Sequence, residues 1–103
     1  MKKYNLIINP FAEEDIKESM EWYNLQKEKL GEEFFQEIKK TAFSIKENPF
    51  QFEEIKNEIR QAIIKRFPFL MFFYIDGSTI NIFAVFHQKR NPRIWKKRIH
   101  GNK

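Results

Sequence analysis

The sequence contains no cysteine, and only three of its 103 residues are glycine. The absence of cysteine excludes a disulfide framework, a thiolate metal site and a cysteine nucleophile. Gly31, Gly77 and Gly101 are too widely spaced for a glycine-rich phosphate-binding loop. The two histidines, His87 and His100, lack neighbouring carboxylates in the sequence. We therefore expect no metal site and no cofactor.

Long apolar runs are also missing. No segment approaches the roughly 20 apolar residues that a membrane-spanning helix needs. The start, Met1-Lys2-Lys3, is similar to that of a signal peptide, but the apolar segment that follows, Leu6–Ile8, is far too short. Because the chain also lacks cysteine, we expect a cytoplasmic protein with no membrane partner. Its length predicts a single domain over residues 1–103.

Acidic residues are scarce in the C-terminal part of the chain. Residues 1–58 carry nine lysines and thirteen acids, a net charge of −4, whereas residues 59–103 carry ten lysines and arginines and one acid, Asp76, a net charge of +9. Segregation of this size predicts an anionic partner, either a nucleic acid or an acidic protein. The alternative is a basic tail, at about residues 91–103, that only aids solubility.

The most apolar part of the sequence predicts a β-hairpin. The runs 69–75 and 80–86 flank Asp76-Gly77-Ser78-Thr79, and Asp-Gly between two such runs is a strong hairpin signal. Strict alternation in the second run would separate two sets of side chains: Ile80, Ile82, Ala84 and Phe86 on one face, and Asn81, Phe83, Val85 and His87 on the other. We expect this strand to be central and to deliver the cations that follow it to one edge of the sheet.

Two amphipathic helices precede this hairpin. Asn9-Pro10 predicts the start of the first, Gly31 its end, and Asn48-Pro49 the end of the second. Segments 4–8 and 59–64 have the composition of strands, while 50–56 is expected to be a connection. The order β-α-α-β-β-β predicts an α+β fold with a mostly antiparallel four-stranded sheet. The helix hairpin would cover one face, the other would form an open groove, and 4–8 or 59–64 would offer an open edge.

Two passages of the sequence resemble the RelE/ParE superfamily, the toxins of type II toxin–antitoxin modules. They are Arg66 to Gly77, with Arg-Phe-Pro-Phe at its start, and Ile82 to Pro92, a hydrophobic strand followed by His-Gln and basic residues. The long helix hairpin and the His-Gln ending are closer to the ParE branch. That branch implies a toxin that inhibits growth by binding DNA gyrase and is neutralised by a cognate antitoxin. The RelE branch implies a ribosome-dependent mRNA endoribonuclease, and a third reading is a non-toxic member that only binds its antitoxin.

The ribonuclease reading assigns roles to four residues. His87 titrates near neutral pH and would be the base, while Arg60, Arg66 and Arg90 would stabilise the phosphate without a metal. The chain departs from the RelE branch because Gln88 stands where a tyrosine often follows the last strand. The structural alternatives are a strand-end hydrogen bond for His87 and, for Arg60, an ion pair with Glu54 or Glu58.

Other cations are predicted to bind a partner or nucleic acid. They are Lys65, Lys89, Arg93 and Arg98, together with Trp95, which would either pack on the fold or contact the antitoxin. The antitoxin segment is expected to be acidic and to form a toxin–antitoxin hetero-oligomer with this chain, whose target would be DNA gyrase or the ribosome and mRNA. The glutamates at 13–21 and 28–37 are expected to be solvated helix faces, with a role facing the antitoxin or gyrase as the alternative.

Overall fold

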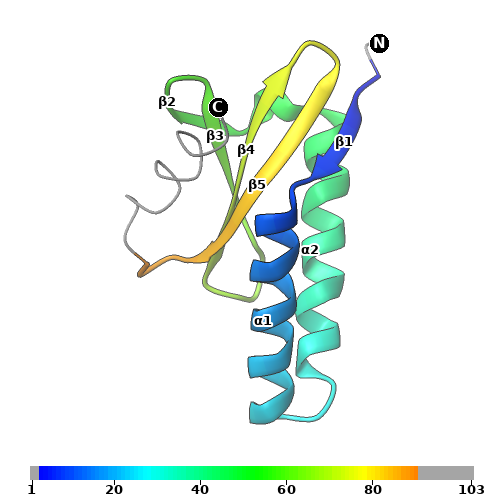
Figure 1. Cartoon of the computed structure of the whole chain (residues 1–103), viewed down its shortest axis with the longest axis vertical. Helices are drawn as coiled ribbons and strands as arrows, with labels where there is room; N and C mark the ends of the chain where they lie inside the picture. Colours follow the sequence, from blue (N-terminus) through cyan, green and yellow to red (C-terminus); the bar gives the residue numbers. More distant parts are fainter. Residues whose placement is uncertain (1–2, 91–103) are drawn as a thin grey trace.

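The computed structural model describes residues 3–90, which form two helices packed on one mixed sheet (Figure 1). The elements in chain order are β1 (Asn5–Ile8), α1 (Pro10–Gln26), α2 (Leu30–Glu47), the short 3₁₀ helix η1 (Pro49–Gln51), β2 (Glu53–Lys56), β3 (Ile59–Ile63), β4 (Phe69–Asp76) and β5 (Thr79–His87). The predictions for Arg93, Trp95 and Arg98 lie outside the described residues.

The sheet has five strands in the order β1-β5-β4-β3-β2, with β1 parallel to β5 and all other neighbours antiparallel. The α+β architecture with a helix hairpin on one face is confirmed. The additional strand, β2, lies in the segment expected to be a connection. Its residues are mostly charged, and it pairs antiparallel with β3, with Glu53 opposite Gln61. Gln61 Nε2 also donates a hydrogen bond to Glu53 Oε1. An open edge is predicted at 4–8 or at 59–64: β1 is an edge strand of the described sheet, which confirms the first position, whereas β2 pairs with β3 and covers the second.

The first helix begins as predicted but ends differently. Asn9 Oδ1 accepts a hydrogen bond from Phe11 N, and Pro10 occupies the first helical position. Gly31 does not end α1; it is buried in the first turn of α2. A Cβ atom at this position would lie 2.3 Å from the Met20 carbonyl oxygen and 2.7 Å from Asn24 Cγ. Glycine is therefore needed here because α1 and α2 approach closely, and not because the helix must stop.

A β-bulge in β5 changes which residues share a face. Phe72 pairs with Ala84 and Phe73 pairs with Ile82, so Phe83 is an extra residue that has no pairing partner on β4. Before the bulge, Ile80 and Ile82 face the helices; after it, Val85 does. Phe83, Ala84 and Phe86 face the other way. The strict alternation predicted for this strand is therefore wrong from Ala84 onward.

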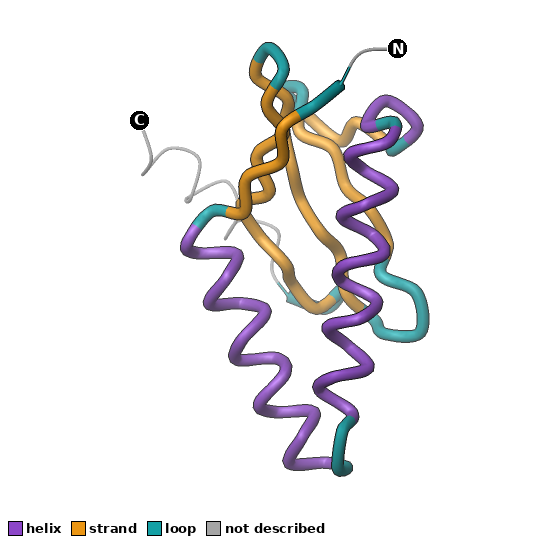
Figure 2. The backbone as a smooth tube through the Cα atoms, turned by 90° about the vertical axis from the view of Figure 1, so that its right-hand side faces the viewer, coloured by secondary structure: helices purple, strands orange, loops and turns teal. Residues whose placement is uncertain are grey.

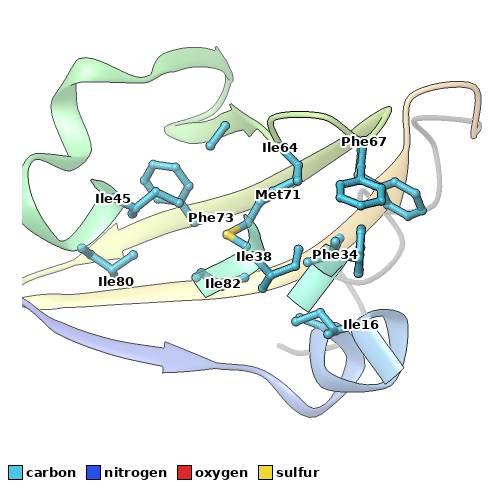
Figure 3. Close-up of a cluster of buried hydrophobic side chains, with 14 of the residues drawn as sticks. Ile16, Phe34, Ile38, Ile45, Ile64, Phe67, Met71, Phe73, Ile80 and Ile82 are labelled. Carbon is cyan, nitrogen blue, oxygen red and sulfur yellow. The ribbon is translucent and has the colours of Figure 1, made fainter. Parts of the chain in front are cut away.

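The main core lies between the helix hairpin and the sheet (Figure 3). Phe34 of α2 is fully buried and its ring contacts those of Tyr23, Phe67 and Phe69. Figure 2 shows that the two helices meet at the short loop and diverge toward the ends that carry β1 and η1. The sheet residues Met71, Phe73, Ile80 and Ile82 fill the space beneath them.

The opposite face of the sheet carries a second apolar cluster. Ile59, Phe72, Phe83, Ala84 and Phe86 form it, and all five are buried. The expectation of an open groove on this face stays a prediction. No helix within residues 3–90 combines the length and the apolar composition needed to cross a bilayer.

Candidate functional site

Four cations lie at one end of the sheet, at the ends of β3 and β5. Both strands are antiparallel to β4, so they run in the same direction and finish at the same edge. Gln88 N donates a hydrogen bond to the Pro68 carbonyl oxygen at 2.8 Å, which joins the segment after β3 to the turn after β5. We call Lys65, Arg66, Lys89 and Arg90, which these two segments carry, the basic end. The prediction that strand ends gather cations at one edge is consistent with this placement.

Arg66 is held by two carboxylates of α2. Its Nη2 lies 2.6 Å from Glu33 Oε1 and its Nη1 lies 3.7 Å from Glu37 Oε2. The hydrogen bond from Arg66 lowers the pKa of Glu33, and the same bond raises the pKa of Arg66. Arg66 also has a φ of 71°, a left-handed conformation that is uncommon for a residue with a side chain. The ion pairs with Glu33 and Glu37 hold the Arg66 guanidinium against α2.

Glu37 differs from the solvated helix faces expected for the acidic cluster 28–37. It is buried, with 7 % of its surface exposed, and its carboxylate also lies 3.7 Å from Lys40 Nζ. Helical spacing alone carries a signal for this placement, because Glu37 lies between Phe34 and Ile38 on the side that packs on the sheet.

His87 and Arg90 lie on opposite faces of the sheet. The His87 ring contacts Phe69 on the helix-covered face, with ring centroids 5.4 Å apart. The Arg90 guanidinium lies 4.5 Å from the centroid of the Phe86 ring on the other face. His87 Nδ1 accepts a hydrogen bond from Lys89 N at 3.1 Å. This is the predicted strand-end bond, except that the partner is a backbone N–H and not a carbonyl.

Arg60 lies at the opposite end of β3 from the basic end. Its guanidinium donates to the Phe52 carbonyl oxygen at 2.7 Å, lies 3.5 Å from Glu54 Oε1 and sits over the Phe50 ring. Since a strand rises about 3.3 Å per residue, Arg60 lies about 10 Å from the end of β3 at Ile63, and Arg66 lies in the turn beyond that end. The predicted ion pair with Glu54 is confirmed. The structure therefore does not bring Arg60 together with Arg66, Arg90 and His87 in one cluster.

Comparison with known proteins identifies the family. A model described as the ParE toxin of the type II toxin–antitoxin system parDE matches residues 6–92. The chain belongs to this ParE toxin family. A solved structure titled "Chromosomal ParDE TA system from P. aeruginosa" matches with a TM-score of 0.73 and 18 % sequence identity, over 82 % of this chain and 96 % of that one. This second likeness concerns the fold. A search of curated proteins gave no match.

One feature of this ParE toxin that sequence reasoning missed is a buried carboxylate. Asp15 of α1 has 7 % of its surface exposed, and its Oδ2 accepts a hydrogen bond from Val85 N at 3.0 Å. β1 pairs with β5 only as far as Ile82, so beyond the end of β1 the Asp15 carboxylate accepts the hydrogen bond of the Val85 amide. The pattern gave a weak signal, because Asp15 precedes the core residue Ile16 and lies near the apolar side of the helix. It is not part of the solvated acidic face.

Within residues 3–90, no group of three or more histidine, aspartate or glutamate side chains lies close enough together to hold a metal ion. What the basic end offers instead is exposed positive charge on two joined segments, with one guanidinium fixed by carboxylates and another stacked on a ring. Exposed positive charge of this kind attracts an anionic surface.

Proposed function

We propose that this ParE-family protein inhibits growth by binding DNA gyrase, performs no hydrolysis itself, and is neutralised by a cognate antitoxin. The observation that carries the proposal is the family match over residues 6–92, which includes both helices and all described strands except the first residue of β1.

The geometry favours binding over RNA cleavage. A metal-free ribonuclease needs a base, an acid and phosphate-binding cations within hydrogen-bond reach of one phosphate. Here the His87 ring and the Arg90 guanidinium lie on opposite faces of the sheet, and Arg60 lies at the far end of β3. Binding of a large partner needs only a complementary surface, and the basic end supplies one.

A supercoiling assay with purified gyrase tests the proposal. We expect the full-length protein to inhibit supercoiling, and we expect cells that express it without antitoxin to show a DNA-damage response and filamentation before translation falls. An unaffected gyrase, together with early loss of translation and cut transcripts, would contradict the proposal and favour the ribonuclease reading. Normal growth without antitoxin would favour the non-toxic reading.

We further propose that the antitoxin contributes an acidic segment that binds at the basic end. Lys65 and Lys89 are exposed there, and within residues 3–90 neither forms an ion pair. Charge-driven binding weakens as salt screens the attraction. We expect the dissociation constant of the toxin–antitoxin complex to rise with ionic strength, and to rise less for a Lys65→Gln, Lys89→Gln variant. A salt-insensitive complex would contradict this assignment.

A further inference from the structure

The face of the helix hairpin that is turned away from the sheet carries two exposed stripes of opposite charge. Glu14, Glu18, Glu21 and Leu25 recur on α1 at spacings of four, three and four. Phe35, Lys39, Phe43 and Lys46 recur on α2 at spacings of four, four and three. Each set lies along one side of its helix, opposite the residues that enter the core, and all eight are exposed. We call these eight residues the outer face.

Large apolar side chains stand among the charges of the outer face. Phe43 has 64 % of its surface exposed and Leu25 has 83 %, while Phe35 has 37 % and lies under Lys39, whose Nζ is 5.2 Å from the ring centroid. Single exposed apolar side chains are common on protein surfaces and do not by themselves indicate a partner. Here they lie among complementary charges, so they add apolar area to a surface that a partner of opposite charge pattern could cover.

From this pattern we infer that the outer face binds the outer face of a second copy of the chain. A two-fold axis running along the hairpin places α1 of one copy over α2 of the other, twice. The acidic stripe then meets the basic stripe in both halves of the interface. Glu18 and Lys39 lie at nearly equal distances in sequence from the turn at Lys29, so they would come opposite one another.

The size of the interface predicts a weak dimer. Helices of this length span about 25 Å and each is about 10 Å wide, so two facing hairpins cover about 1,000 Å² in total. This area lies at the lower end of the range for specific interfaces, and we expect a dissociation constant in the micromolar range. The sheets would lie on the outside of the dimer, which leaves the basic ends accessible. The inference does not rest on the proposed function.

Charge exchange gives the sharpest test. One full-length variant carries Glu14→Lys, Glu18→Lys and Glu21→Lys, and a second carries Lys39→Glu and Lys46→Glu. In a homodimer of either variant, like charges would face each other, whereas in a mixed dimer every stripe would face its opposite. We expect each variant alone to be monomeric and the mixture to dimerise, by sedimentation from about 1 µM to about 1 mM.

A third variant tests the apolar contact. We expect Phe43→Ser to weaken dimerisation at least about tenfold, while the control Ile63→Ser, on a side chain 66 % exposed in β3, leaves it unchanged. Circular dichroism checks that each variant is folded. The inference is overturned if the parent chain stays monomeric throughout this range, if the mixed variants do not associate, or if Phe43→Ser dimerises like the parent.

Discussion

The two faces of the sheet use aromatic residues differently. On the helix-covered face, Phe34, Phe67 and Phe69 pack around Tyr23, and the His87 ring extends this cluster to the strand end. On the other face, Phe86 carries the Arg90 guanidinium. Phe86 and His87 are consecutive strand residues, so they face opposite sides of the sheet with or without the bulge. The bulge at Phe83 decides which face each takes: it places His87 on the helix-covered face and Phe86, with Arg90, on the other.

The largest effect is expected from removing the ring that joins helix and sheet. Phe34→Ala should lower the free energy of unfolding by about 3–5 kcal/mol, because the ring is fully buried and its removal leaves a cavity among three aromatic side chains. Urea unfolding measures the change. On the other face, Tyr74→Ala provides the comparison. Because Tyr74 is 36 % exposed, its replacement should lower the free energy of unfolding much less. Equal losses would contradict the difference drawn between the faces.

Gly31→Ala tests how closely the helix layer is packed. The added Cβ would meet the Met20 carbonyl oxygen, which is backbone and cannot rotate away, so we expect a loss of about 1–3 kcal/mol from the strain of overpacking. The melting temperature measures it. Gly77→Ala is the control for backbone conformation. Gly77 has a φ of 61° and open space around it, so any loss of stability in this variant comes from the backbone conformation alone. A neutral Gly31→Ala would refute the close approach of α1 and α2.

Asp15→Ala should destabilise the protein by about 1–3 kcal/mol, because Val85 N loses its acceptor just beyond the bulge. Asp15→Asn keeps an oxygen that can accept the hydrogen bond from Val85 N, so this variant should lose less stability. Hydrogen exchange at Val85 gives the direct readout and should become faster in the alanine variant. Glu14→Ala, on an exposed neighbour, is the matched control. If the Val85 amide exchanged at the same rate in all three variants, the role of Asp15 would be refuted.

The smallest effect concerns pH. Arg66 lowers the pKa of Glu33 in the folded protein, so the stability from this pair is present above the ordinary glutamate pKa and is lost as the pH falls through the lowered folded value. Both side chains are largely exposed, so the contribution is small. Glu33→Gln should flatten the acid side of the stability curve slightly, whereas Glu32→Gln should not. If the stability of Glu33→Gln depended on pH in the same way as that of the parent, the contribution of the Arg66–Glu33 ion pair would be contradicted.

The sequence was sufficient for elements with strong local signals. Asn9-Pro10, Asn48-Pro49 and Asp76-Gly77 mark boundaries that depend on neighbouring residues alone, and the structure confirms them. The bulge at Phe83 escaped prediction because apolar residues fill both faces of β5, so the side-chain pattern carries no record of register. β2 escaped because its charged residues lack the alternation of a half-buried strand.

The candidate site was only partly predictable for a related reason. That cations follow β5 can be read from the sequence, and topology then brings Lys65 and Arg66 to the same end. The interactions that fix individual side chains, however, depend on contacts between segments that are distant in the sequence. Arg66 pairs with Glu33, which lies 33 residues away, and Asp15 reaches Val85 across 70 residues. Local pattern carries no information on pairs of this separation.

We propose that the protein acts through binding at the basic end and not through proton transfer by His87. The most direct measurement is growth inhibition by two folded variants expressed without antitoxin. His87→Asn retains an acceptor for Lys89 N but cannot act as a base near neutral pH; the other variant carries Lys65→Glu, Lys89→Glu and Arg90→Glu. The account predicts that His87→Asn inhibits growth like the parent and that the charge-reversed variant does not. Loss of toxicity in His87→Asn, with toxicity retained after charge reversal, would contradict it.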